Sequence, residues 1–397
     1  MNDDGLTESF TQALWGQCLE RMRESGNILD GAALADSPES AHEAVDYLFM
    51  TLSSAYVLMA RSDPDYPEFL PFVNHIFPYA GANPDATYYY TSLSGSGTYR
   101  IVGHRNTVHW VDFLTGYDYV GFVKKSGKSF PSRNLDDFEI NADGSFEFLL
   151  SNVRPDGYVG NWMKLEAEAN HMVVRQFAYR PDEVDARMAI ERVDKPALPK
   201  FHTAADASER IRKVMDHLHT SSMTWPKFLG RLKDKKVINR FQSITYDTGD
   251  AQGQIYQEGL YEIGLDQAML IEVKVPTRCS YWNVQIADTL WRTMDWINRP
   301  NTLNGYKDRS DSDGVMRVVV AHRDPGIENW IDAAGVTEGE LLWRWQGADS
   351  TPEPVVTVVD FDELDKCLPA HSKRIAPAQR AEALREWTIA RQLRRSW

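Results

Sequence analysis

The sequence has little cysteine and no long apolar run. Its 397 residues include only three cysteines, Cys18, Cys279 and Cys367, which are too widely separated for metal-ligand or redox spacing. This argues against a disulfide scaffold and against a zinc module, so no metal or other cofactor is expected. No segment approaches the roughly 20 apolar residues that cross a bilayer, and the N-terminus lacks the basic start of a secretory signal. The sequence therefore predicts a cytoplasmic protein that does not contact a membrane.

Acidic residues outnumber basic ones, 57 to 43, and several familiar motifs are missing. The net charge of -14 repels phosphate backbones, so no nucleic-acid partner is expected. The chain contains no Gly-x-Ser-x-Gly elbow, no phosphate loop and no His-Glu-x-x-His helix. The exception to the acidic balance is the basic segment from Lys373 to Arg395, interpreted as a charged final helix. That helix is either solvated or part of a subunit contact, which leaves a homo-oligomer open.

Two periodicities alternate along the chain. Apolar residues at three- and four-residue spacing predict helices, whereas short β-branched and aromatic runs with Gly and Asp-Gly turns predict antiparallel strands. The expected class is α+β, with two mainly antiparallel β-domains, the second a β-sandwich or jelly roll. The expected divisions are an N-terminal helical region (1–82), a first β-domain (83–195), a helical insert or linker (196–262), the second β-domain (263–362) and a helical tail (363–397).

Pro226 falls within the apolar stripe of the helical insert. Proline removes a helical hydrogen bond and clashes with the preceding turn. The sequence therefore predicts that the helix of this insert is interrupted at Pro226.

Strand alternation in the run from Tyr281 to Ile286 separates two faces. Trp282 and its alternate neighbours form an apolar face, whereas Tyr281, Asn283 and Gln285 share the opposite face. A phenol and two amides orient a ligand oxygen if this face lines a cavity, and form an ordinary outer face if it meets solvent. An acid, a cation and a further amide follow closely and favour the cavity: Asp288, Arg299 and Asn304.

Two arginines lie among apolar residues of expected strands. Arg175 shares its strand face with Val173 and Phe177, so its guanidinium needs an ion pair or an anionic ligand. Asp182 or Glu191, on the connection that follows, is the expected partner. Arg344 invites the same two interpretations.

Other candidates depend on single residues. His109, beside Trp110, has an imidazole that can take and give a proton at neutral pH, although a structural role is the favoured interpretation. A rigid turn at Asp324-Pro325-Gly326 presents Asn329 and Trp330. The tryptophans around that turn either fill a core or form the wall of an apolar pocket.

Two stretches carry a resemblance to a known family. The stronger lies within residues 281–345 and comprises Tyr281-Trp282-Asn283-Val284-Gln285, Asn304, Asp313-Gly314, Asp324-Pro325-Gly326, Asn329-Trp330 and Arg344-Trp345. The weaker lies within residues 83–192 and comprises Asn83-Pro84-Asp85, Tyr99-Arg100-Ile101-Val102-Gly103, Asp143-Gly144, Asn161-Trp162, Val174-Arg175 and Ile190-Glu191-Arg192. With these segments the chain resembles the bacterial domain of unknown function 1214 family. The resemblance implies a jelly-roll sandwich for the C-terminal region and supplies no catalytic residues.

The expected function is metal- and nucleotide-independent acid-base chemistry of the lyase or isomerase type. The aromatic content and the family context favour a hydrophobic substrate such as a terpenoid, a steroid or an aromatic catabolite. The proton-transfer candidates are Tyr90, His109, Tyr281 and Asp288. The substrate-binding candidates are Arg175, Trp282, Asn283, Gln285, Arg299, Asn304 and Trp330. The alternatives are a non-catalytic module that binds a small molecule or a protein, and an atypical hydrolase or transferase in which Asp288 activates water.

Overall fold

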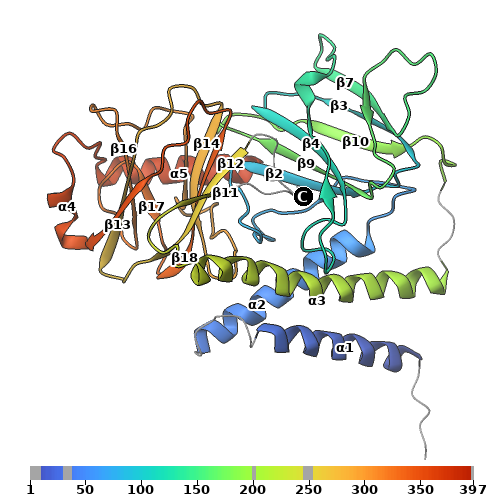
Figure 1. Ribbon diagram of the computed structural model, residues 1–397, viewed down its shortest axis with the longest axis horizontal. Coiled ribbons are helices and arrows are strands. Elements are labelled where there is room, and N and C mark those ends of the chain that lie inside the picture. The colour runs from blue at the N-terminus through green and yellow to red at the C-terminus, as the bar shows by residue number, and fades with distance from the viewer. Residues whose placement is uncertain (1–9, 30–37, 199–202, 245–253, 395–397) are drawn as a thin grey trace, which may run out of the picture.

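The computed structural model describes residues 10–29, 38–198, 203–244 and 254–394. Two β-sandwiches stand side by side, with three helices beneath them and a final helix packed across both (Figure 1). The predicted α+β class with two mainly antiparallel β-domains is confirmed. Among the described residues no helix has the length and apolar character needed to span a bilayer.

The first sandwich packs a six-stranded sheet against a four-stranded sheet. Inward-facing residues of both sheets form its core, in which the Phe113 and Phe148 rings meet edge to face with centroids 5.1 Å apart. The six-stranded sheet contains β1 (Leu70–Pro71), β2 (Ala86–Ser92), β4 (Trp110–Tyr117), β5 (Lys128–Ser129), β6 (Arg133–Asn134) and β9 (His171–Phe177). The four-stranded sheet contains β3 (Thr98–His104), β7 (Ser145–Ser151), β8 (Trp162–Lys164) and β10 (Arg187–Arg192).

The second sandwich has a five-stranded and a four-stranded sheet. Its core contains the apolar face predicted for the strand from Tyr281, with Trp282 stacked on Trp343 at 5.6 Å between ring centroids. The five-stranded sheet contains β11 (Gln242–Ile244), β12 (Gln254–Glu262), β14 (Tyr281–Ala287), β15 (Thr302–Asn304) and β18 (Glu338–Gln346). The four-stranded sheet contains β13 (Gln267–Val273), β16 (Met316–Ala321), β17 (Trp330–Asp332) and β19 (Val355–Asp360).

Both sandwiches extend beyond the ranges expected from the sequence. β1 pairs with β2, so the first sandwich begins before residue 83. β12 pairs with β18 along its whole length, which places residues 254–262 in the second sandwich. The sequence pattern assigns residues 254–262 to the helical insert, because it shows the period of the side chains but not which strands pair.

Helices α1 (Phe10–Leu29) and α2 (Pro38–Ala55) pack against the long helix α3 (Ala204–Asp234). The predicted interruption at Pro226 is wrong, because α3 continues through it. Buried residues lie on both sides of the proline, including Leu218 and Leu229. Their packing outweighs the roughly 3 kcal/mol that an internal proline costs a helix.

Helix α5 (Pro377–Arg394) joins the two sandwiches rather than lying free in solvent. The Trp387 indole donates to the carbonyl of Trp296 at 2.9 Å in the second sandwich. Arg391 and Arg394 reach the first sandwich, where Arg394 donates to the Gln176 carbonyl at 2.7 Å. Helix α5 therefore connects the two sandwiches within one molecule, and we call it the strap. Its charge pattern did not indicate this role.

Candidate functional site

The polar face of β14 is covered by residues 81–85 of the first sandwich. Gln285 donates through Nε2 to the Ala82 carbonyl at 2.9 Å, and Asn283 donates through Nδ2 to Asn83 Oδ1 at 3.2 Å. Both amides are fully buried. This face therefore meets neither solvent nor an open cavity directly, because a chain segment about 200 positions away in sequence satisfies its hydrogen bonds.

Asp85 is the point at which this network meets α5. Its buried carboxylate accepts from the Tyr281 hydroxyl at 2.9 Å and from Asn304 Nδ2 at 3.1 Å. Arg391 of α5 pairs with the same carboxylate at 2.7 Å. Burial, with the Asp85 charge nearby, raises the pKa of Tyr281 well above its usual value, so this phenol is a hydrogen-bond donor at neutral pH.

A cavity of about 130 Å³ lies beside this network, between the two sandwiches and α3. We call it the inter-sandwich cavity. Residues 81–83 form one edge, where Gly81 has a φ of +59° and a Cβ at this position would lie 2.8 Å from the Trp291 indole nitrogen. Eight of the 18 residues that line it are aromatic: Phe72, Tyr88, Tyr119, Phe177, Trp225, Phe228, Tyr256 and Trp291.

The two arginines singled out in the sequence both line this cavity. Arg175 of β9 pairs with Asp112 of the neighbouring strand β4 at 3.4 Å, so an ion pair exists but not with the expected carboxylates. Asp182 pairs with Arg180 and Glu191 with Arg100. Strand pairing explains this, because Asp112 lies directly opposite Arg175 in the β4–β9 register.

Arg344 of β18 is buried, with 5% of its surface exposed. Each of its described hydrogen bonds goes to a neutral oxygen. It donates to Gln285 Oε1 at 2.5 Å, to Asn283 Oδ1 at 3.3 Å and to the Gly81 carbonyl at 2.6 Å. Within the described residues no carboxylate forms an ion pair with it. Arg344 therefore presents a positive charge at the cavity wall.

Behind the wall lies a buried carboxyl group that sequence reasoning missed. Glu340 accepts through Oε2 from the Trp291 indole at 2.6 Å, and its Oε1 has no hydrogen-bond partner among the described residues. Burial and the nearby charge of Glu258 raise the pKa of Glu340 to about 8. The Glu340 carboxyl lies against Gly81 and Trp291, which line the cavity, and is not itself part of the cavity wall.

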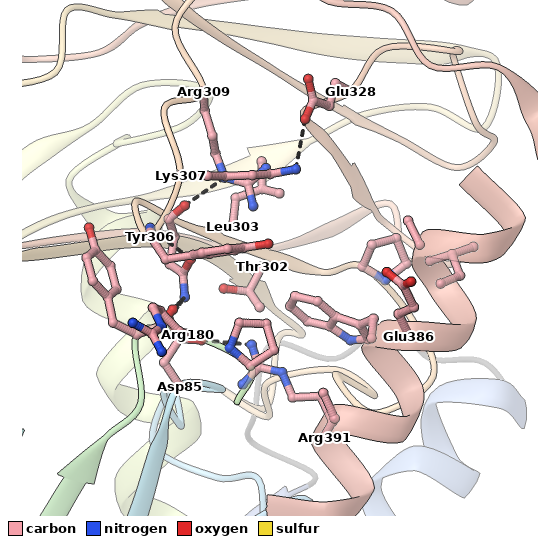
Figure 2. A pocket seen from close by; sticks show the side chains of 18 of the residues that line it. Asp85, Arg180, Thr302, Leu303, Tyr306, Lys307, Arg309, Glu328, Glu386 and Arg391 are labelled. Atoms are coloured by element: carbon pink, nitrogen blue, oxygen red, sulfur yellow. Dashed lines mark hydrogen bonds and ion pairs between the residues drawn. The ribbon is translucent and has the colours of Figure 1, made fainter. Parts of the chain in front are cut away.

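A second, larger pocket of about 280 Å³ lies between α5 and both sandwiches, and we call it the α5 pocket (Figure 2). Its walls include residues 302–309 of the second sandwich, and α5 contributes Glu386 and Arg391. Six basic and three acidic side chains line it: Arg180, Lys307, Arg309, Arg380, Arg391 and Arg394, against Asp85, Glu328 and Glu386. Two residues predicted from the sequence, Asn304 and Trp330, belong to this pocket.

The structure does not bring the other predicted residues to either cavity. Tyr90 lies in the core near α3, where burial raises its pKa to about 12. His109 is exposed and contacts the Ser280 carbonyl at 3.2 Å. Burial raises the pKa of Asp288, which pairs with Arg292 at 2.7 Å.

Two predicted ligand contacts are engaged elsewhere. Trp282 lies in the core of the second sandwich, on the opposite side of β14 from the polar network. Arg299 pairs with Asp332 at 2.6 Å. Across the described part of the chain, no group of three or more His, Cys, Asp or Glu side chains is arranged to hold a metal ion.

Sequence reasoning missed three residues that the structure makes central: Asp85, Arg309 and Glu340. Asp85 stands in the quoted Asn83-Pro84-Asp85 motif, directly before β2, so it carried a local signal as a turn residue. Glu340 alternates with Leu342 and Arg344 on β18, and this spacing was a signal for a shared face. Arg309 follows β15 in a loop, and nothing local distinguishes it.

Comparison with known proteins finds a similar fold and assigns no activity. An uncharacterised protein from Burkholderia cenocepacia has a similar structure, with a TM-score of 0.82 and 25% sequence identity over 88% of this chain and 97% of that chain. A protein from Vibrio parahaemolyticus aligns with a TM-score of 0.46 and 12% identity over 80% of this chain and 98% of that chain. No curated protein matches the chain.

A family model matches most of the first sandwich, without β1 and β10, together with the segment that covers β14. The match is to "Protein of unknown function (DUF1214)" over residues 80–183, which includes Asp85, Asp112 and Arg175. The stretch that showed the stronger resemblance, residues 281–345, lies outside the matched range. The resemblance predicted from the motifs is confirmed over residues 80–183, where the chain is similar to this family.

Proposed function

We propose that this protein binds a small hydrophobic molecule, about the size of one aromatic ring and bearing an anionic or strongly accepting oxygen, in the inter-sandwich cavity. The volume of about 130 Å³ supports this size. An apolar cavity of roughly 150 Å³ in another protein holds benzene. Aromatic walls such as Trp225 and Trp291 offer stacking and edge contacts to a ring.

Arg344 is the observation that carries the proposal. A buried guanidinium is costly unless an anion or several oxygens compensate it. Arg344 is held in place by amide and carbonyl oxygens, so its orientation is fixed before a ligand arrives. An anionic oxygen of a ligand would complete its charge compensation through a charge-assisted hydrogen bond.

Filling the cavity is expected to abolish binding. Val120 lines the cavity, so Val120→Trp would occupy the space of the ring. Benzoate and phenol are suitable probes, with binding measured by isothermal titration calorimetry. The native protein should bind benzoate saturably and more tightly than phenol, because only benzoate offers Arg344 a full negative charge.

Val153→Trp provides the matched control, since Val153 is 74% exposed. That variant should bind benzoate as the native protein does. Equal affinity for benzoate in the Val120→Trp variant would contradict the proposal.

Acid-base catalysis is the second candidate function, and Glu340 is the observation that favours it. Its carboxyl lies behind Gly81 and Trp291 with a pKa of about 8. Once ionised, above about pH 8, this carboxylate can accept a proton from the carbon next to a ligand carbonyl, exchange that proton with solvent and return a solvent-derived proton to the same carbon. Deuterium incorporation into acetophenone, followed by NMR, would test this chemistry. The Glu340→Gln variant should lose any such exchange while retaining the binding of benzoate.

A further inference from the structure

Arg309 differs from the cations near it in the α5 pocket, because those cations form ion pairs. Arg380, Arg391 and Lys307 pair with Asp324, Asp85 and Glu328 at 3.0, 2.7 and 2.8 Å, so their charges are compensated. Arg309 is 7% exposed, and among the described residues no carboxylate forms an ion pair with it.

The described hydrogen bonds of Arg309 go to neutral oxygens. It donates through Nε to the Asn304 carbonyl at 2.6 Å and through Nη1 to Asn329 Oδ1 at 3.3 Å. Burial lowers the pKa of Arg309, and the carboxylates of Glu328 and Asp85, which form no ion pair with it, offset this only in part. The nearby carboxylate of Glu328 is engaged by Lys307 (Figure 2).

The surroundings of Arg309 combine paired charges with apolar surface. Of the other basic side chains that line the pocket, Arg180, Arg380 and Arg394 form ion pairs with Asp182, Asp324 and Asp185, so Arg309 is the lining cation that has no ion pair among the described residues. Tyr179, Tyr306, Trp330 and Trp387 contribute aromatic surface, and Leu303 and Leu384 add aliphatic surface.

We propose that the α5 pocket is a second ligand site, which takes an organic carboxylate larger than one ring, with the carboxylate on Arg309 and the apolar body against Trp330 and α5. A guanidinium of this kind binds carboxylates through charge-assisted hydrogen bonds. The pocket volume of about 280 Å³ is roughly twice that of the inter-sandwich cavity, so a two-ring acid fits here and not there. The ligand would contact α5 as well as the second sandwich, and its binding would stabilise the strap.

Calorimetric titration of the full chain with 2-naphthoate tests this site. The native protein should bind 2-naphthoate saturably, and Arg309→Gln should weaken binding by about 10- to 100-fold, the range expected for a hydrogen bond to a charged group. Arg385→Gln is the matched control, because Arg385 lies on α5, is 66% exposed and forms an ion pair with Glu382 at the surface. It should bind 2-naphthoate as the native protein does.

A second variant keeps the test decisive if Arg309→Gln does not fold. Ala383 lines the pocket from an exposed position on α5, so Ala383→Trp should fill the pocket and abolish binding without touching Arg309. The Val120→Trp variant should still bind 2-naphthoate, which separates this site from the inter-sandwich cavity. Unchanged binding in Ala383→Trp would overturn the proposal, and so would displacement of 2-naphthoate by equal concentrations of inorganic phosphate.

Discussion

Replacing Asp85 with asparagine is expected to lower the free energy of unfolding by roughly 3 to 5 kcal/mol, the cost of removing one partner of a buried ion pair. The substitution leaves the guanidinium of Arg391 without its carboxylate. It also replaces the acceptor of the Tyr281 and Asn304 hydrogen bonds with an amide. Equilibrium urea unfolding, followed by tryptophan fluorescence and circular dichroism, would measure the change.

The same substitution should loosen α5 selectively. Arg391 is one of the residues that tie this helix to the first sandwich, so amide hydrogen exchange in α5 should accelerate more than exchange in β14. Asp182→Asn is the control, because Asp182 is 71% exposed and pairs with Arg180 at the surface. It should cost less than about 1 kcal/mol. A similar cost for both variants would show that Asp85 does not hold the strap.

Glu340 is expected to make the protein less stable as the pH rises. Its pKa is about 8 in the folded protein, against an ordinary value of 4.5, so between these limits the folded state holds a proton that the unfolded state has lost. The free energy of unfolding should therefore fall by up to about 1.4 kcal/mol for each pH unit from about 4.5 to about 8. Below this window the carboxyl is neutral in both states and contributes no pH dependence.

The Glu340→Gln variant should lose most of this dependence, because an amide does not titrate and still accepts from the Trp291 indole. Unfolding free energies at pH 5, 6, 7 and 8 would show a flatter profile than that of the native protein. Glu338→Gln is the matched control on the same strand, since Glu338 is partly exposed and pairs with Lys233 at 3.0 Å. If Glu340→Gln and Glu338→Gln have the same pH profile, Glu340 does not carry the proton.

Much of the fold follows from local patterns in the sequence. Period-two alternation predicted the strand from Tyr281 and separated its polar residues from Trp282, and the structure places the two sets on opposite sides of β14. The same pattern gave the strands that contain Arg175 and Arg344. Arg175 has an ion-pair partner, as expected for a buried guanidinium, whereas the described hydrogen bonds of Arg344 go to neutral oxygens.

The partners themselves could not be predicted, because they depend on which strands pair and which segments meet. Arg175 meets Asp112 through the register of β4 and β9, 63 positions apart in sequence. Gln285 meets Ala82 across 203 positions. Contacts between residues so far apart in sequence cannot be recognised from periodicity or composition. The role of α5 was missed for the same reason, since a basic helix has the same sequence pattern whether it is solvated or strapped across two sandwiches.

The most direct test of a ligand site between the sandwiches is anomalous diffraction from crystals of the full chain grown with 4-bromobenzoate. A bromine peak is expected in the inter-sandwich cavity among Trp225, Trp291 and Tyr256, with the carboxylate within hydrogen-bond distance of Arg344. Bromine found only on the outer surface, or only in the α5 pocket, would contradict the proposal.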